Sequence, residues 1–174
     1  MSLIGVHHTG IIVKNLDRSI YFYHDVLGAE FVSEPGPWFT GDELAKGVGV
    51  PGASLRQACL RFGDSIVELV EYGNRPEGND TPMPQNRLGA MHVGLRVDDA
   101  VKTRAELEAK GIEFFTEVNF VDDGVIAGWR WVYFTDPDGI TLELVELAYV
   151  EEDKRREGIA RYLAERPSLE SLLT

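Results

Sequence analysis

Two histidines and two glutamates occur in matching sequence contexts, and together these residue types can bind a metal ion. His8 is followed by Thr-Gly-Ile-Ile-Val, and His92 is followed by Val-Gly-Leu-Arg-Val. Glu68 and Glu143 each begin the sequence Glu-Leu-Val-Glu. Two imidazoles and two carboxylates suit a borderline divalent ion such as Ni, Co, Zn, Mn or Fe(II), and they leave positions open for water or substrate. We therefore predict that the four residues bind one divalent metal ion.

The repeated glutamates strengthen this interpretation. Glu68 and Glu71 are three residues apart, so in a strand their side chains point to opposite faces. We expect one glutamate of each pair to face inward and the other to be solvated. An inward carboxylate in a strand-rich core is costly unless it is paired or bound to a metal. A single strand histidine is more typical of an ordinary core or surface position, but histidine and glutamate recur here at equivalent places.

The matches belong to an internal repeat that covers most of the chain. Gly28-Ala29-Glu30-Phe31 is similar to Gly111-Ile112-Glu113-Phe114, and it lies between the histidine and glutamate matches in the same order. Three matches in one order predict two copies of a single module. The copies span about 5–73 and 89–148. The first copy is longer, and residues 33–54 can absorb the difference.

Each copy has the same expected order of elements. Alternation, β-branched residues and turn pairs predict strands, and capping residues with a stop glycine predict one helix in each copy. In the first copy the expected elements are a strand at 4–13, a helix at 17–27 begun by Asp17, and strands at 30–33, 55–62 and 65–72. In the second they are a strand at 91–97, a helix at 100–110, and strands at 113–116, 130–135 and 140–147. The fold class is therefore α+β, with two βαβββ modules.

The remaining segments set the domain organisation. We predict one domain over 1–150, with a linker at 74–88 between its modules. Residues 34–54 form a loop too long to be a simple connector, and loops of that length are often lids or binding segments. Residues 151–174 are predicted to form a helical C-terminal extension. Its apolar stripe, Ile159, Tyr162 and Leu163, would pack on the domain or on a partner chain.

Composition excludes several classes of protein. The formal net charge is −12, and the only dense basic cluster, at 154–156, is flanked by acidic residues, so nucleic acid and anionic membrane are not expected partners. No apolar run approaches the roughly 20 residues of a membrane span. The N-terminus lacks the pattern of a signal peptide, and the single cysteine, Cys59, fits a reducing compartment. A cytoplasmic location is the expectation.

The chain resembles the vicinal oxygen chelate superfamily, which includes glyoxalase I, methylmalonyl-CoA epimerase, fosfomycin resistance proteins and extradiol dioxygenases. The residues that carry the resemblance are His8 to Val13, the helix from Asp17 to Gly28, Met91 to Gly94, and Phe134 to Gly139 leading to Glu143. The resemblance implies that the two modules form a curled eight-stranded mixed sheet around a metal-binding cavity. It places the ligands on the first and last strand of each module, at the positions that the repeat had identified, and it implies a homodimer.

The ligand set is similar to that of bacterial glyoxalase I, which implies nickel or cobalt, and to that of the epimerases, which usually have glutamine in the second place. Both imply a lyase, isomerase or epimerase that chelates vicinal oxygens of a small substrate and works through an enediolate. Glu143 is the candidate base and Glu68 the second candidate.

Two alternatives stay open. An extradiol-type ring-cleaving dioxygenase would need Fe(II) on His8, His92 and Glu143 alone. Such enzymes usually have a further histidine near the pocket, whereas His7 should face the opposite side of its strand and His24 should face solvent. The second alternative is a non-catalytic small-molecule binding protein of the antibiotic-resistance type, whose members generally lack the complete metal set.

Candidate pocket residues lie on the long loop and on two strands. Trp38 and Phe39 could close over a substrate or anchor the loop on the core. Arg130 could hold a substrate carboxylate or form a surface ion pair, and Arg56 has the same two options. One parity of the strand at 130–135 should face the cavity, which makes Tyr133 a candidate.

Overall fold

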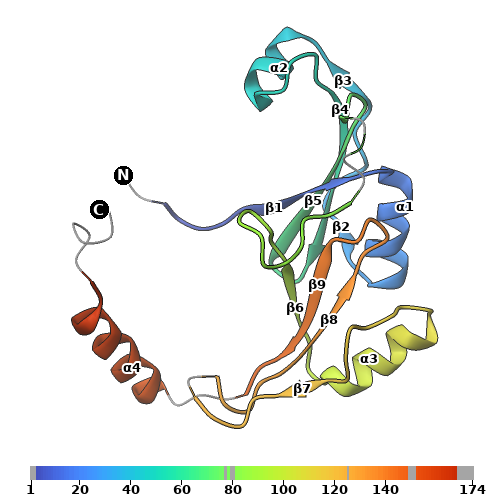
Figure 1. The fold of residues 1–174 in the computed structure, drawn as a ribbon. Helices are drawn as coiled ribbons and strands as arrows, with labels where there is room; N and C mark the ends of the chain where they lie inside the picture. The colour runs from blue at the N-terminus through green and yellow to red at the C-terminus, as the bar shows by residue number, and fades with distance from the viewer. Residues whose placement is uncertain (1–2, 77, 79–80, 125, 149–151, 168–174) are drawn as a thin grey trace.

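The computed structural model describes residues 3–76, 78, 81–124, 126–148 and 152–167. Its strands form two mixed sheets, one above the other in Figure 1. The first sheet has the order β1-β5-β4-β2, with β3 paired to β4, and the second has the order β6-β9-β8-β7. The strands of the first sheet are β1 (His8–Val13), β2 (Glu30–Phe31), β3 (Phe39–Thr40), β4 (Ser54–Phe62) and β5 (Ser65–Tyr72). Those of the second are β6 (Val93–Arg96), β7 (Asn119–Phe120), β8 (Arg130–Thr135) and β9 (Thr141–Glu146).

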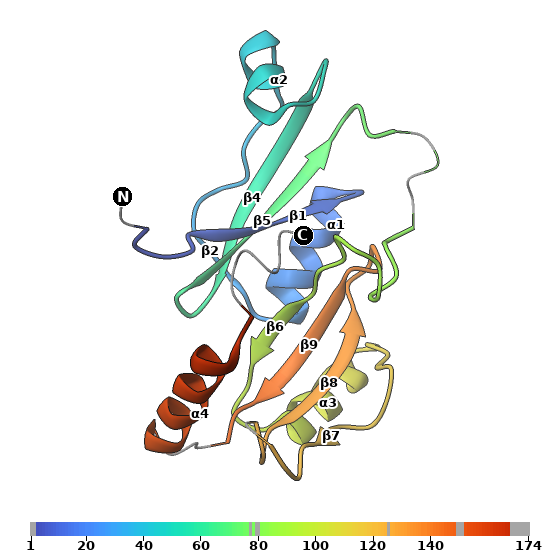
Figure 2. The ribbon, with the colours of Figure 1, turned by 60° about the vertical axis from the view of Figure 1, so that its left-hand side comes forward.

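The repeat is visible in the strand pairing, which confirms the α+β class and the two modules. β1 runs parallel to β5, and β6 runs parallel to β9 (Figure 2). In each module the last strand also pairs antiparallel with the strand before it. Gly10 lies opposite Glu68, and Gly94 lies opposite Glu143. The equivalent residues of the two copies therefore occupy equivalent places in two separate sheets.

Each module's main helix begins with an amide or carboxylate side chain as its cap. The helices are α1 (Leu16–Ile20), continued by the π-helix η1 (Tyr21–Val26), and α3 (Ala100–Ala109). The side chain of Asn15 accepts a hydrogen bond from the backbone of Arg18, so the helix starts earlier than the expected cap at Asp17. Asp99 is the matching cap of α3. Side-chain oxygens at this position satisfy backbone N–H groups that the first turn leaves unpaired.

Some expected elements differ in the structure. The segment 34–54 is not a plain loop, because it contains β3 and the helix α2 (Asp42–Val48), which ends at the left-handed Gly49. The strand expected at 113–116 is reduced to one bridge between Phe114 and Phe134. The C-terminal extension does form the helix α4 (Glu152–Glu165). None of the helices in the described ranges is long and apolar enough to cross a membrane.

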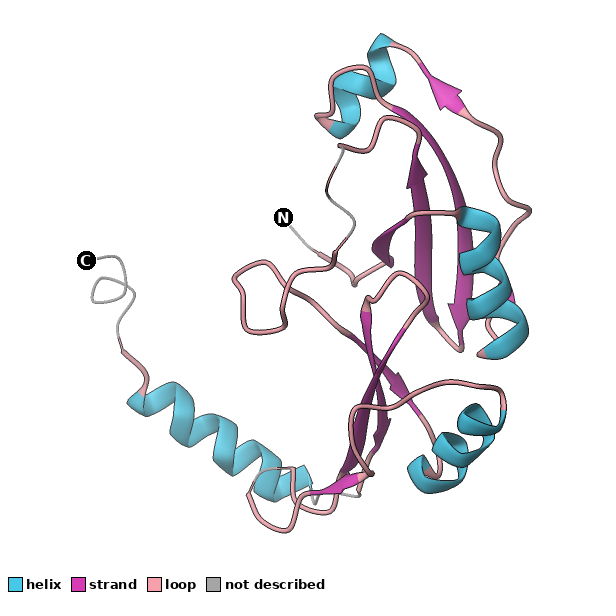
Figure 3. Cartoon of the chain, turned by 45° about the vertical axis from the view of Figure 1, so that its right-hand side comes forward, coloured by secondary structure: helices cyan, strands magenta, loops and turns pink. Residues whose placement is uncertain are grey.

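The helix α4 does not pack on the domain. Figure 3 shows it on the side of the sheets opposite to α1 and α3. Ile159, Tyr162 and Leu163 are exposed at 47%, 66% and 49%. The expectation that this stripe packs on the domain was therefore wrong, and packing on a partner chain stays a prediction.

One hydrophobic core serves both modules. It contains Leu16 and Tyr23 from the first module together with Val132, Phe134 and Leu142 from the second, and all five are fully buried. The helices α1 and α3 lie on the same side of the two sheets (Figure 3). We call the two sheet faces that point away from these helices the open faces.

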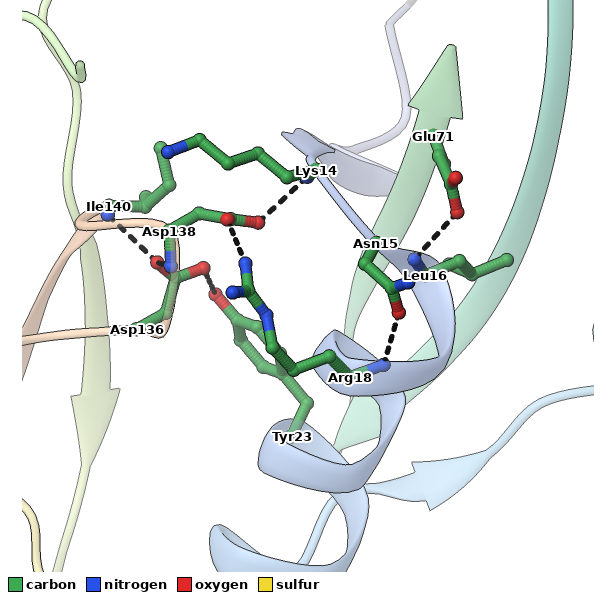
Figure 4. Close-up of polar contacts among 9 residues, drawn as sticks. All are labelled: Lys14, Asn15, Leu16, Arg18, Tyr23, Glu71, Asp136, Asp138 and Ile140. Atoms are coloured by element: carbon green, nitrogen blue, oxygen red, sulfur yellow. Dashed lines mark hydrogen bonds and ion pairs between the residues drawn. The ribbon is translucent and has the colours of Figure 1, made fainter. Parts of the chain in front are cut away.

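A buried polar network joins the modules (Figure 4). The hydroxyl of Tyr23 donates to Oδ2 of Asp136 at 3.2 Å, and Oδ1 of Asp136 accepts two backbone N–H groups of its own turn. Asp138 in the same turn accepts the backbone N–H of Lys14 at 2.8 Å and pairs with Arg18. Burial raises the pKa of Tyr23 and of Asp136. The Asp-Pro-Asp-Gly turn therefore links the second module to the helix of the first.

Replacing Tyr23 by phenylalanine should destabilise the protein by about 1–2 kcal/mol, because it leaves a buried carboxylate oxygen of Asp136 without its donor. Urea denaturation followed by circular dichroism measures the change. The matched control is Tyr21→Phe, since Tyr21 is 63% exposed and its hydroxyl should contribute less than about 0.5 kcal/mol. Equal effects of the two substitutions would contradict a linking role for the Tyr23 hydroxyl.

Candidate metal centre

The alternation of β1 places His8 on the open face of the first sheet. Ile11 and Val13 are 5% and 1% exposed because they point into the core, whereas His8, Gly10 and Ile12 point to the other side and are exposed. Glu68 lies on the same face of the neighbouring strand. Its Oε2 is 3.3 Å from Nε2 of His8. We call these two residues the first pair.

The second module builds an equivalent second pair. His92 immediately precedes β6 and Glu143 lies in β9, with 3.4 Å between Nε2 of His92 and Oε2 of Glu143. A Cβ atom at Gly94 would lie 3.6 Å from this carboxylate, and one at Gly10 would lie 3.8 Å from that of Glu68. Glycine at both positions therefore keeps the space above each carboxylate open.

The donor set and its spacing fit a metal ion pair by pair. Nitrogen and oxygen ligands lie about 2.1 Å from a divalent transition metal, so two ligands in adjacent positions are roughly 3.0–3.4 Å apart. The separations of 3.3 and 3.4 Å match this spacing. Each pair thus has the geometry of two ligands of one ion.

The structure brings the four expected ligands together as two separate pairs. Across residues 3–76, 78, 81–124, 126–148 and 152–167, no cluster of three or more histidine, cysteine, aspartate or glutamate side chains could hold a metal ion. The two pairs lie in separate sheets, although the sheets open to the same side (Figure 3). The four-ligand centre therefore stays a prediction.

The surroundings of the two carboxylates differ. Burial raises the pKa of Glu143, and the neighbouring His92 partly opposes this shift. The ring of Tyr133 lies 5.3 Å from the ring of His92, and burial together with the charge of Glu143 raises the pKa of its hydroxyl. In the first module Cys59 lies opposite Glu68 in the strand register, as Tyr133 lies opposite Glu143. The carboxylate of Glu143 therefore has an aromatic neighbour, Tyr133, at the place where that of Glu68 has Cys59.

Two neighbours of the pairs were missed or misplaced by sequence reasoning. Cys59 follows from the register of the hairpin at 54–72, and burial and the charge of Glu68 raise the pKa of its thiol. His7 was expected on the opposite face from His8, yet their Nδ1 atoms are 2.8 Å apart. This contact leaves Nε2 of His8 directed to the carboxylate. His24 bonds to the carbonyl of Ala29 at the end of its helix, at 2.7 Å.

The second glutamate of each repeat has a structural role. Glu71 accepts the backbone N–H of Leu16 at 2.7 Å, and Glu146 accepts that of Ala100 at 2.9 Å. The expectation that these glutamates are solvated was therefore wrong. Each carboxylate closes the start of its module's helix, where negative charge is favourable.

The same register favours the ion-pair option for the two candidate arginines. Arg56 pairs with Glu71 at 2.8 Å, and Arg130 pairs with Glu146 at 2.8 Å, both on the helix side of their sheets. They do not face the first or second pair, because in the strand register each arginine lies opposite the glutamate that caps the helix. Of the candidates on these two strands, Tyr133 lies on the open face.

The aromatic residues of the long loop act as anchors. The Arg56 guanidinium carbon lies 5.4 Å from the centre of the Trp38 ring, and Phe39 lies in β3, paired with Leu55 of β4. Both aromatic side chains remain about half exposed. These contacts fit the second of the two roles expected for Trp38 and Phe39, that of anchoring the loop.

Comparison with known proteins identifies the family. The model of the Glyoxalase/Bleomycin resistance protein/Dioxygenase superfamily matches residues 5–144. The chain belongs to this superfamily. It is 33% identical over 147 residues to a 2-epi-5-epi-valiolone epimerase of Actinomyces sp., covering 83% of this chain and 80% of that protein. It is also 28% identical over 147 residues to the mitochondrial methylmalonyl-CoA epimerase of Bos taurus, covering 82% of this chain and 72% of that protein.

Two further similar proteins are a lyase and a glyoxalase family protein of known structure. The chain is 28% identical to a lactoylglutathione lyase of Schizosaccharomyces pombe over 162 residues, covering 83% of this chain and 48% of that protein. A glyoxalase family protein of Bacillus cereus has a similar crystal structure, with a TM-score of 0.70, 23% identity, and coverage of 86% of this chain and 97% of that one. The superfamily fold is thus confirmed over nearly the whole of both modules.

Proposed function

We propose that the chain is a metal-dependent lyase, isomerase or epimerase that acts on a small oxygen-rich substrate. The observation that carries this proposal is the repeated pair of a histidine Nε2 and a glutamate Oε2, 3.3 Å apart in the first module and 3.4 Å apart in the second. Relatives named as epimerases and as a lactoylglutathione lyase support the reaction class.

His8, Glu68, His92 and Glu143 are the residues that would hold the divalent ion. The ion would chelate two adjacent substrate oxygens and stabilise negative charge that develops on them. The protein's own task is then to move a proton to and from the carbon beside the carbonyl. Removal of this proton gives an enediolate, and the face and carbon to which the proton returns decide between epimerisation and isomerisation.

Glu143 is the proposed base. Its carboxylate is only 15% exposed and its pKa is raised by burial, which brings it closer to the pKa of a useful proton acceptor at neutral pH. Tyr133 lies opposite it in the strand register, and its ring contacts that of His92. Glu68, across the centre in the other module, is the proposed partner that returns the proton.

We further propose that the centre is completed between two copies of the chain. The pairs are separate within the described part of one chain, but both open faces point to the same side (Figure 3). A twofold axis would bring the first pair of one copy to the second pair of the other, and it would do so twice. The helix α4 lies on this side (Figure 3), and its exposed Ile159, Tyr162 and Leu163 supply apolar surface for a partner.

Metal titration tests the centre directly. Metal-free protein should bind about one Ni²⁺ or Co²⁺ per chain in isothermal calorimetry. Since losing even an indirect supporting group typically costs 10–100-fold in metal affinity, His8→Ala and His92→Ala should each weaken binding by at least about 100-fold. His24→Gln is the matched control, because this histidine bonds to a carbonyl at the helix end. Absence of binding by the unaltered protein, or equal loss in the control, contradicts the proposal.

A further inference from the structure

The open face of the first sheet continues from the first pair into a cavity of about 490 Å³. The cavity lies where three segments meet. They are the end of β1, Val50 just after α2, and the inter-module linker. Most of its walls are apolar or aromatic; among them are Ile12, Val50, Tyr72, Pro76, Pro82 and Met83. Its volume is within the range of pockets that take small molecules.

The cavity is in line with the first pair. Ile12 is four residues beyond His8 on the same face of β1, and Tyr72 is four residues beyond Glu68 on the same face of β5. Four residues of strand span about 13 Å. A molecule whose oxygens lie at the first pair can therefore extend along this face toward the cavity.

The walls that close the cavity come from segments that the repeat does not share. Val50 lies in the extra length of the first module, and Pro76, Thr81, Pro82 and Met83 lie in the linker. Pro82 is held in place against the second module, since a Cβ atom at Gly139 would be 2.9 Å from Cγ of Pro82. The pairs are common to both modules, whereas the cavity occurs at one end of the first module, where the linker and Asp138 and Ile140 of the second module complete its walls. This asymmetry suits selection among substrates that share the same reacting group.

We propose that the cavity binds the apolar part of the substrate, an alkyl chain or unsubstituted ring attached to the α-hydroxycarbonyl unit that reacts at the metal. This inference rests on the proposed function, whose reacting unit it extends. Val50, in the long segment 34–54, is among the residues that line the cavity. The substrates are therefore amphiphilic, with oxygens at one end and hydrocarbon at the other.

The chain's three methionines allow a test that does not depend on activity. Met83 lines the cavity, and Met91 precedes the metal ligand His92. Metal-free protein labelled with carbon-13 at the methionine methyl groups is titrated with straight-chain α-hydroxyketones from decyl to tetradecyl, whose chains are long enough to cover the roughly 13 Å between the first pair and the cavity. The Met83 methyl signal should shift saturably and more than that of Met91. Affinity should rise about fourfold for each added methylene until the cavity is full.

Ile12→Asn should abolish this dependence on chain length, because it places an amide in the apolar wall. Ile12 is 50% exposed, so the fold should tolerate the change. Val101→Asn is the matched control on α3, away from the cavity, at a position 58% exposed. Affinity independent of chain length, or a shift confined to Met91, overturns the inference. The proposed function is judged separately, by metal-dependent exchange of the substrate α-proton in deuterium oxide.

Discussion

Replacing Glu143 by glutamine should lower kcat for α-proton exchange by about 10²–10⁴-fold at saturating metal. Glutamine keeps the shape of the side chain and can still offer an oxygen to a metal, but it cannot accept the proton. Burial raises the pKa of the Glu143 carboxylate above its ordinary value, although the neighbouring His92 partly opposes this shift. Exchange measured by NMR in deuterium oxide gives kcat, and metal affinity is measured in parallel.

The matched control is Glu113→Gln, which makes the same change of charge at an exposed residue outside the metal centre. It should leave both kcat and metal affinity unchanged. Glu68→Gln should lower metal affinity with a smaller loss of kcat than Glu143→Gln. If Glu68→Gln causes the larger loss of kcat, the assignment of Glu143 as the base is wrong.

Mixing two inactive variants should restore activity if the centre is shared between copies. His8→Ala removes a ligand from the first pair, and His92→Ala removes one from the second. In a mixed dimer of these variants one centre lacks both histidines and the other is intact. With random exchange of chains, half of the dimers are mixed and half of their centres work, so about a quarter of the activity of the unaltered protein should return.

The control for this experiment combines two variants of the same pair. A mixture of His8→Ala with Glu68→Ala should remain inactive, because both centres of every mixed dimer then lack a ligand of the first pair. Activity is measured after the chains have been exchanged under mild denaturation and refolded. Failure of the first mixture to recover, with dimers demonstrably mixed, would mean that the four ligands converge within one chain.

The modules and both pairs could be predicted from the sequence because the information is local and repeated. Strand alternation, helix caps and the Glu-Leu-Val-Glu repeat each involve neighbouring residues, and their recurrence fixes the correspondence between copies. The repeat alone thus shows that His8 corresponds to His92 and Glu68 to Glu143. The structure then placed each pair at 3.3 and 3.4 Å.

The face of each strand was harder to predict. Arg56 and Arg130 were candidates for the cavity, yet both face the helices, because their partners Glu71 and Glu146 cap those helices. One residue of register reverses which side chains are inside. The sequence contains this information only once the strand partner of each arginine is known.

The position of one module relative to the other could not be predicted either. Equivalent residues in two copies imply a pseudo-twofold relation, but the repeat does not say whether the facing module belongs to the same chain. In the structure the modules share a core on their helix side, and the open faces are left beside each other. In that arrangement the first and second pairs are apart, whereas the pseudo-twofold relation of the modules had suggested one four-ligand site.

The core shared by the two modules has a consequence for how the chain folds during synthesis. The contact between Tyr23 and Asp136 joins residues 113 apart in the sequence. Leu16 and Phe22 likewise belong to the same core as apolar side chains of β8 and β9, which are translated long after them. Contacts this distant in sequence form late and slow folding. The first module should therefore emerge from the ribosome with the apolar side chains of its helix still exposed. We expect it to bind chaperones until β9 has been translated.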